Sequence, residues 1–330
     1  MNNDRIVKCC REWLDTFVVA ISVAMCFRAY FYEPFNIPTG SMRPTLYGNY
    51  TEAAKPGEGG AFDMPVLSFF KFILTGETYK EFRAPWSGRV KVLPRNDGCY
   101  DVMVVNSMHR PDANLRGVRS LWRWLAGLVA ENGYDNYAGI AKIPTDAMDF
   151  RSIDGAQVGK GDLLWCGRVK KGDFIFVNRW LWNFRRPRRG DVMIFSTTGL
   201  APSETGMHPG ADGRRYAVQQ GTHYIKRMTA IPGDTLEIKD AAVYIDGERQ
   251  PSFKPETGAA GEKSPPYDPG GMAGPVTLGK DEYFACGDNS FPAQMSYDSR
   301  YWGAVPGEKL RGVAACVFWP IVNPRAGRIK

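Results

Sequence analysis

Histidine is scarce in this chain of 330 residues, which contains only His109, His208 and His223. Their positions do not show the pattern of a Ser-His-Asp triad, so histidine-based nucleophilic catalysis is not indicated. Metal-binding patterns are lacking as well, because the seven cysteines include no Cys-x-x-Cys pair and show no metal-ligand spacing. We therefore expect no metal and no other cofactor.

Long blocks of like charge are also absent, although the formal net charge is +7. A basic chain can bind nucleic acid or anionic lipid, but charge spread along the sequence does not point to DNA. One segment, residues 179–189, reads RWLWNFRRPRR and interleaves aromatic residues with arginines. Such a segment can stack on bases or contact lipid headgroups. We expect a solvated basic loop there and no nucleic-acid partner.

Helix-forming runs are few, whereas 36 glycines and 23 prolines punctuate short apolar stretches. Examples are FIFV at 174–177 and DVMIF at 191–195. Short apolar runs bounded by turn residues are typical of strands, so the sequence predicts a mainly β fold. Four cysteines after the amino-terminal region leave their pairing open between bridges and buried free thiols; they are Cys99, Cys166, Cys286 and Cys316.

Residues 13–32 form an apolar run near the amino terminus, WLDTFVVAISVAMCFRAYFY. Its uncharged part, 16–27, is shorter than the ~20 residues that cross a bilayer, but snorkelling of Arg28 can extend it to a full span. A cleavable signal peptide is the alternative, since basic residues precede the run and Ser22-Val23-Ala24 resembles a cleavage site. We predict a retained anchor with the basic flank in the cytoplasm and the bulk of the chain outside.

Two segments downstream carry candidate chemistry. Residues 33–46 read EPFNIPTGSMRPTL, and the prolines stiffen the backbone around Ser41. Residues 224–234 read YIKRMTAIPGD, which suits a strand with Tyr224 and Lys226 on one face, ended by a Pro-Gly-Asp turn. Alone, each signal is weak, because a serine in a turn and a lysine on an edge strand are common structural features.

A third segment, residues 286–303, gathers hydroxyls, carboxylates and an arginine, which can also pair locally without any catalytic purpose. Together, and in this order, the three segments resemble the type I signal peptidases, or leader peptidases, a bacterial family with a serine/lysine dyad. Matching segments also include FYEPF at 31–35, GDFIFV at 172–177 and RGDVMIF at 189–195. The resemblance covers residues 12–46 and 170–320.

The resemblance implies that Ser41 is the nucleophile and Lys226 its general base. It also implies an oxyanion hole formed by the Thr39 hydroxyl and the Ser41 backbone N–H. Thr39 stands where the family often has serine, which preserves the donor. A lysine can act as a base near neutral pH only where burial lowers its pKa, and Ile225, Met42 and Tyr224 are candidate walls for such a pocket.

By the same resemblance, Ser296 orients the lysine, and Asp298 with Arg300 forms a supporting ion pair. The loop 290–295 before Ser296 is longer than the compact loop usual in the family, which makes the match at Ser296 weaker than at the dyad. We expect an extended substrate to bind by strand addition, with shallow pockets for small side chains. The resemblance assigns these pockets to Phe35, Ile37, Pro38, Met42, Leu46, Ile175, Ile194, Tyr224 and Ile225.

The implied activity is an endopeptidase that removes amino-terminal signal peptides from exported preproteins after small residues of the Ala-x-Ala type. The resemblance implies a mainly β signal-peptidase-type catalytic domain with one transmembrane helix, at the outer face of the bacterial plasma membrane. Expected partners are preproteins and membrane lipid, close to the secretion translocon. The expected organisation is a cytoplasmic terminus (1–12), an anchor (13–32), a catalytic domain (33–46 and 171–330) and an insertion (47–170).

The insertion is a large α+β segment that the family does not normally carry, and no role follows from its sequence. Residues 81–105 read as two or three short strands. Residues 115–130, LRGVRSLWRWLAGLVA, read as an amphipathic helix, which we expect to pack onto a domain core and not onto a membrane surface.

Other functions fit the sequence less well. Residues 68–71 spell Ser-x-x-Lys, but the Ser-Asp-Asn and Lys-Thr-Gly partners of penicillin-recognising enzymes do not occur. A self-cleaving repressor-type protease shares the dyad chemistry but lacks the anchor. A membrane-tethered scaffold without activity is the non-enzymatic alternative, and cleavage of a preprotein with an Ala-x-Ala site separates it from the enzyme.

Overall fold

The computed structural model describes residues 3–60, 63, 65–94, 99–105, 140–144, 153–200, 208–209, 215–216, 218–292 and 295–329. The chain divides into two compact units. The first unit comprises Met1–Gly48, Asp173–Trp319 and Asn323–Lys330, and the second comprises Asn49–Gly172 and Pro320–Val322. Each unit has its own sheets and its own hydrophobic core.

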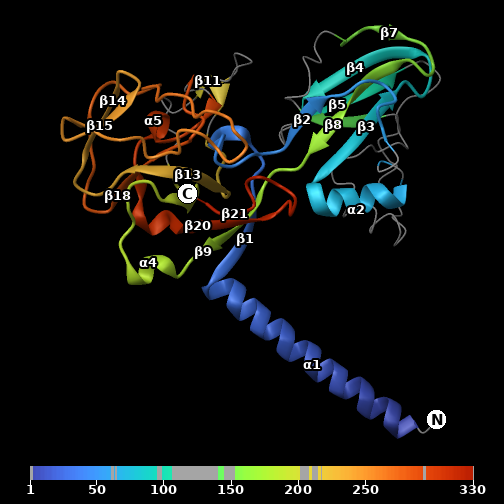
Figure 1. Ribbon diagram of the computed structural model, residues 1–330, viewed down its shortest axis with the longest axis horizontal. Helices are drawn as coiled ribbons and strands as arrows, with labels where there is room; N and C mark the ends of the chain where they lie inside the picture. Colours follow the sequence, from blue (N-terminus) through green and yellow to red (C-terminus); the bar gives the residue numbers. More distant parts are fainter. Residues whose placement is uncertain are drawn as a thin grey trace. The chain divides into compact units, whose positions relative to one another are not determined.

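The first unit begins with α1 (Asn3–Tyr30), a single uninterrupted helix that leads into the sheet (Figure 1). Its segment Arg11–Tyr30 has 20 residues, a mean hydropathy of 1.4 and no burial within the protein. At a rise of about 1.5 Å per residue such a segment can span a hydrocarbon core. The helix ends at Tyr30, four residues before Pro34. A proline has no backbone N–H and cannot continue the helical hydrogen bonding. The expected apolar amino-terminal helix is therefore present, with the length and composition of a membrane span.

The main sheet of the first unit is antiparallel, in the order β1-β9-β20-β10-β13-β18-β19, with β21 paired to β20. The strands on one side are β1 (Tyr32–Asn36), β9 (Phe174–Asn178), β20 (Leu310–Trp319) and β21 (Gly327–Arg328). The others are β10 (Val192–Ser196), β13 (His223–Ala230), β18 (Glu282–Cys286) and β19 (Val305–Pro306). Alternate residues of β10 enter two different clusters: Ile194 packs with Ile175, whereas Met193 packs with Met228. The period of two along a strand thus gives the sheet an apolar layer on each face.

A second, smaller sheet in this unit has the order β16-β15-β14-β17. Its strands are β14 (Thr235–Lys239), β15 (Ala242–Ile245), β16 (Glu248–Arg249) and β17 (Val276–Thr277). Leu236, Ile238 and Phe284 share its core, so this sheet packs against the end of β18. Short elements complete the unit: the 3-10 helices η1 (Gly40–Met42) and η6 (Gly307–Lys309), the helices α4 (Leu181–Phe184) and α5 (Ser299–Trp302), and the hairpin β11 (His208–Pro209) and β12 (Arg215–Tyr216).

The second unit contains two antiparallel sheets and a helix, α2 (Pro65–Thr75). One sheet has the order β2-β8-β3, and the other has the order β6-β5-β4-β7. The strands are β2 (Tyr50–Ala53), β3 (Glu77–Arg83), β4 (Gly88–Pro94), β5 (Cys99–Val105), β6 (Ile140–Pro144), β7 (Gln157–Val158) and β8 (Leu163–Lys170). The strands expected over 81–105 are confirmed as the end of β3 with β4 and β5. The helix expected at 115–130 lies outside the described residues, and the functional roles of the domains stay a prediction.

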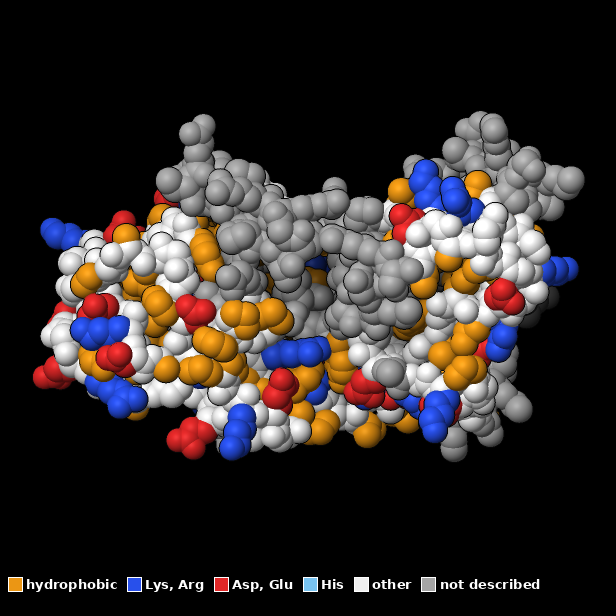
Figure 2. Space-filling model, turned by 90° about the horizontal axis from the view of Figure 1, so that it is seen from above, with side chains coloured by type: hydrophobic (Ala, Val, Ile, Leu, Met, Phe, Trp, Pro, Cys, Tyr) orange, Lys and Arg blue, Asp and Glu red, His pale blue; other side chains and the backbone are white. Residues whose placement is uncertain are grey.

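The arginine-rich run 179–189 is less solvated than the sequence suggested. Arg185 donates two hydrogen bonds of 2.7 Å to the Asp191 carboxylate. Arg189 pairs in the same way with Asp234, at 2.7 and 2.6 Å. A planar guanidinium can donate two parallel hydrogen bonds to one carboxylate, so these two arginines stabilise a turn. On the face drawn in Figure 2, the described charges of both signs are interspersed with apolar side chains and form no continuous basic field.

Cys166, Cys286 and Cys316 are free thiols, which answers the question of pairing for three of the four cysteines considered. The side chain of Cys99 lies outside the described residues.

Candidate active site

The nucleophile candidate, Ser41, lies in η1 directly after an extended segment that continues from β1. Thr39 is extended, with φ −120° and ψ 158°, and precedes the tight turn at Gly40. Met42 and Leu46 are completely buried on the downstream side. Ile37 upstream donates its N–H to the Asp173 carbonyl at 2.9 Å. The serine is therefore fixed by buried apolar side chains on both sides, which limits the movement of its hydroxyl.

The base candidate, Lys226, lies on β13, where it is paired with Met193 of β10. Its side chain is buried, and Nζ lies 2.7 Å from the Ser41 Oγ atom. The two residues are 185 positions apart in the chain, so only the folded sheet brings them together. At this distance a proton can pass directly between the hydroxyl and the amine.

Burial changes the chemistry of this lysine. Removal of water from around the amine lowers the pKa of Lys226 to about 8, although the Asp298 carboxylate opposes the shift. The Arg300 guanidinium supports it, because two nearby positive charges repel. The ring of Tyr224 lies on the same side, with its centroid 5.9 Å from Nζ. A lysine with this pKa exists partly as the neutral amine near neutral pH, which is the form that accepts a proton.

Asp298 and Arg300 form an ion pair with Nη2 2.7 Å from Oδ2, and both side chains have no exposed surface. Burial acts to raise the Asp298 pKa, but the adjacent guanidinium outweighs it and the pKa lies below its ordinary value. Ser296 is also completely buried and donates to Asp298 at 2.8 Å. The Ser296 hydroxyl thus binds the carboxylate, and the orientation of Lys226 by Ser296 stays a prediction.

The remaining predicted positions group around the nucleophile to different degrees. The Thr39 hydroxyl lies 3.5 Å from Ser41 Oγ, while Pro38 is exposed. Most of the pocket residues share one apolar cluster: Ile37, Met42, Leu46, Ile175 and Ile194, with Phe35 and Ile225 packed against it. Tyr224 packs in the cluster on the other face of the sheet. His223 lies beside the cluster, with its ring 5.4 Å from that of Phe35, and His109 lies outside the described residues.

The sequence reading missed a buried network next to the dyad. Arg227 follows Lys226 and points to the opposite side of β13, where it binds the Asp288 carboxylate through two bonds of 2.7 Å. Thr45, four residues after Ser41, donates to the same carboxylate. Asn289 donates its backbone N–H to the Ser41 carbonyl at 3.1 Å and its side-chain amide to the Gly40 carbonyl at 3.2 Å.

Strand alternation was the available signal for this network, since it places Arg227 on the face opposite Lys226. Its partner could not be read from the sequence, because 61 residues separate Arg227 from Asp288. The Ser-x-x-Lys alternative gains nothing from the structure, because the Lys71 amine is engaged by the Asp63 and Glu77 carboxylates. Among the described residues, no group of three or more His, Cys, Asp or Glu side chains could hold a metal ion.

Comparison with known proteins decides the family. The model of the signal peptidase family, peptidase S26, matches residues 10–69 and 167–319, which is more than half of the chain. The chain belongs to this family. Ser41 and Lys226 both lie inside the matched ranges. Most of the second unit lies outside them.

Individual relatives are similar to slightly less than half of the chain. A probable signal peptidase I-2 from Synechocystis is 31% identical over 155 residues, covering 47% of this chain and 58% of the relative. A signal peptidase I from Leptolyngbya laminosa is 28% identical over 153 residues, covering 46% of this chain and 63% of the relative. A crystal structure of a signal peptidase I from Enterococcus faecalis matches with a TM-score of 0.23 and 22% identity, covering 39% of this chain and 97% of that one. The matched region of this family member thus spans about three fifths of the first two relatives.

Proposed function

We propose that this chain is a signal peptidase I that hydrolyses exported preproteins with Ser41 as nucleophile and Lys226 as general base. The observation that carries the proposal is the 2.7 Å distance between Ser41 Oγ and the buried Lys226 Nζ. A buried amine beside a serine hydroxyl supplies a base without any histidine. Family membership and the names of the relatives support the reaction class.

The reaction starts when neutral Lys226 takes the Ser41 proton and the serine oxygen attacks the scissile carbonyl carbon. The carbonyl oxygen becomes negatively charged and is stabilised by the Ser41 backbone N–H and the Thr39 hydroxyl. The Lys226 ammonium then returns the proton to the leaving amine, the C–N bond breaks, and an acyl-enzyme remains on Ser41. Water attacks this ester with Lys226 again acting as the base, which releases the carboxylate product and restores the serine.

Asp298 and Arg300 support the dyad without touching the reacting atoms. The buried carboxylate attracts the Lys226 ammonium that forms after proton transfer, while the guanidinium keeps the carboxylate ionised. Ser296 and the Gly287 N–H each donate to Asp298 at 2.8 Å and fix its orientation. The side chains of Asp298, Arg300 and Ser296 therefore set the electrostatic environment in which Lys226 gains and loses its proton.

Substrate binding by strand addition is supported by two strand edges. β1 is the terminal strand of the main sheet and continues directly into the segment that carries Ser41. β13 pairs with β18 only from Arg227 onward, so its part from His223 to Lys226 has a ladder partner on the β10 side alone among the described strands. An extended peptide can pair with such an edge through its main chain, while the apolar cluster around Ile194 accepts small side chains.

The anchor sets the location of the reaction. Three basic residues, Arg5, Lys8 and Arg11, precede the apolar run, whereas Arg28 is the one basic residue near its other end. This asymmetry favours a cytoplasmic amino terminus and an extracytoplasmic first unit at the bacterial plasma membrane. The site would then meet preproteins as they leave the translocon. Protease added to intact spheroplasts should digest the carboxy-terminal bulk, whereas full protection would refute this orientation.

The activity is tested with the full-length chain in detergent and a preprotein that carries an Ala-x-Ala site. Mass spectrometry of the products should show one cut after the second alanine of that site. Ser41→Ala is the matched inactive variant, because it removes the nucleophile and one oxygen atom only. Absence of cleavage by folded wild-type protein, or an equal rate with Ser41→Ala, would overturn the proposed function.

A further inference from the structure

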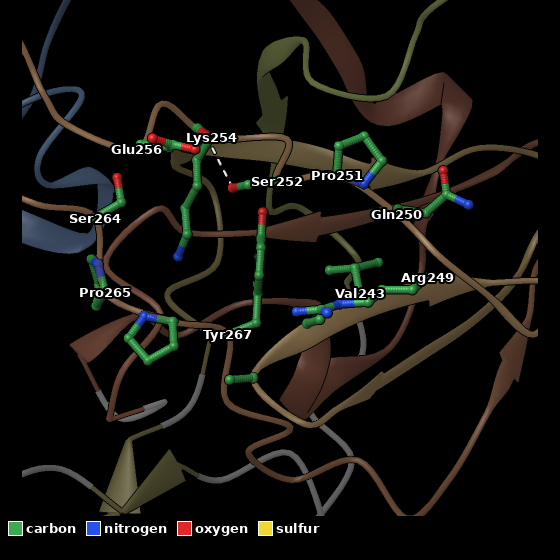
Figure 3. A pocket seen from close by; sticks show the side chains of 13 residues that line it. Val243, Arg249, Gln250, Pro251, Ser252, Lys254, Glu256, Ser264, Pro265 and Tyr267 are labelled. Carbon is green, nitrogen blue, oxygen red and sulfur yellow. Dashed lines mark hydrogen bonds between the residues drawn. The ribbon is translucent and has the colours of Figure 1, made fainter.

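A second buried lysine, Lys254, reaches the catalytic region from the loop between β16 and β17. Its side chain is 5% exposed, and Nζ donates to the Asp288 carbonyl at 3.0 Å. The amine also lies 4.1 Å from the centroid of the Tyr267 ring, a cation–π contact. Figure 3 shows the side chains of Lys254 and Tyr267 next to each other on the inner wall of a pocket of about 260 Å³.

The contact of Lys254 falls on the turn that holds the nucleophile. Asp288 accepts from Lys254 through its backbone carbonyl, and the following residue, Asn289, donates to the carbonyls of Ser41 and Gly40. The Asp288 carboxylate is already occupied by Arg227. Lys254 is therefore connected to the backbone of Ser41 through two intervening residues, Asp288 and Asn289.

The turn packs closely against Ser41 at Gly287. A Cβ atom built on Gly287 would lie 2.4 Å from the Ser41 carbonyl oxygen and 2.0 Å from Ser296 Oγ. The loop that carries Lys254 also packs closely against the segment that follows Ser41, since a Cβ on Gly258 would lie 2.4 Å from the Pro44 carbonyl oxygen. A displaced Lys254 loop would thus move the surroundings of Ser41.

A buried lysine such as Lys254 is energetically unfavourable in a protein core, because its amine loses its hydration. Loss of hydration lowers its pKa to about 8, with Asp288 opposing the shift and Arg300 and Arg227 adding to it. The neighbouring Tyr267 hydroxyl is buried and has no hydrogen-bond partner among the residues that the structure describes. An apolar side chain of similar length would fill the space without these desolvation costs, because buried polar groups stabilise only when they are fully paired. A residue that lowers stability and lies next to an active site often contributes to function.

We propose that Lys254 is a positioning residue for the dyad: it fixes the Asp288–Asn289 turn and thereby the distance between Ser41 and Lys226. The inference rests on the proposed function, because its first readout is the cleavage rate. The assigned role acts through the turn and not through contact with substrate or the reacting atoms. Loss of the Lys254 amine should lower turnover and should not change substrate binding. A small displacement of the dyad atoms, of about a few tenths of an ångström, affects proton transfer but not the walls of the substrate pocket.

The test compares Lys254→Met with Lys263→Met, a substitution of the same kind at an exposed lysine of the same loop. For Lys254→Met we expect kcat to fall about tenfold, with KM within twofold of wild type, because small misplacements of catalytic groups are costly. The midpoint of thermal unfolding should stay equal or rise, since a desolvated amine is removed. Lys263→Met should match wild type in all three quantities. Unchanged kcat for folded Lys254→Met would overturn the inference, as would a loss of kcat that merely follows a lowered unfolding temperature.

A double variant and a readout without turnover complete the experiment. If Lys254 acts through the turn, Lys254→Met with Asn289→Ala should be little slower than Asn289→Ala alone, because coupled residues are not additive. Multiplied losses would contradict the proposal. Hydrogen–deuterium exchange of peptides covering 286–290 should speed up several-fold in Lys254→Met and not in Lys263→Met. If wild-type protein cleaves no preprotein, the proposed function fails, while the exchange measurement still decides whether Lys254 holds the turn.

Discussion

Arg227 and Asp288 form an ion pair whose side chains are each 1% exposed, immediately beside the candidate base Lys226. Asp288→Asn keeps the shape of the side chain but leaves the buried guanidinium without its countercharge. Breaking a buried pair from one side costs on the order of 3–5 kcal/mol. We expect a lower unfolding midpoint in thermal denaturation followed by circular dichroism. Asp240→Asn, at an exposed turn, is the control and should behave as wild type; equal midpoints for both would contradict the assigned role of the pair.

Thr39 is proposed to supply one of two hydrogen bonds to the charged oxygen of the transition state. Thr39→Ala should reduce kcat by roughly a hundredfold or more, the usual effect of removing one oxyanion donor. Thr39→Ser keeps the hydroxyl and should be mild. Both variants are compared with wild type under saturating substrate in detergent. Similar losses for the two substitutions would show that the methyl group, and not the hydroxyl, is what matters at this position.

The pH dependence of the rate follows from the pKa of Lys226 in the folded protein, about 8. The neutral amine is the active base, and its fraction rises as the pH passes upward through this value. Single-turnover cleavage should therefore accelerate about tenfold per pH unit well below the pKa and level off above it. A rate that is constant between pH 6 and 9 would rule out titration of the base in this range.

The second unit is predicted to be dispensable for the chemical step. Its flanking residues in the first unit are held together, since Tyr47 N donates to the Asp173 carboxylate and Asp173 N to the Tyr47 carbonyl, both at 2.8 Å. A short Gly/Ser linker in place of 49–172 can therefore join the two sides without strain. The shortened chain should still cleave a short signal-peptide substrate. A folded but inactive product would show that the second unit contributes to catalysis.

The candidate dyad followed from the resemblance of three ordered segments to the type I signal peptidases, because the motifs around Ser41 and Lys226 are weak signals on their own. The mainly β fold and the apolar amino-terminal helix were likewise predictable from periodicity and run length. The contacts of Asp288 were not, because its partners Arg227 and Lys254 lie 61 and 34 residues away without a local signal. Arg185 shows the opposite error, since composition alone suggested a solvated side chain and the fold supplies a carboxylate at 2.7 Å.

The folding control for the dyad is Lys226→Met, which replaces a desolvated amine by an apolar side chain of similar length. The variant should be inactive yet at least as stable as wild type below pH 8. Between about 8 and 10.5 the unfolded state of wild type binds more protons than the folded state, so wild-type stability rises and the advantage of methionine shrinks. Thermal unfolding at pH 7 and 10 checks this sign, and a strongly destabilised Lys226→Met would contradict it.

The central claim is that Lys226 acts as a neutral base, and cleavage of a preprotein by Lys226→Arg tests it most directly. A guanidinium keeps the positive charge but stays protonated at any working pH, so it cannot accept the Ser41 proton. The measurement is turnover in detergent at pH 8, with the fold of each variant verified by circular dichroism. We expect Lys226→Arg to be as inactive as Lys226→Ala and Ser41→Ala; near-normal cleavage by Lys226→Arg would contradict the Ser/Lys mechanism.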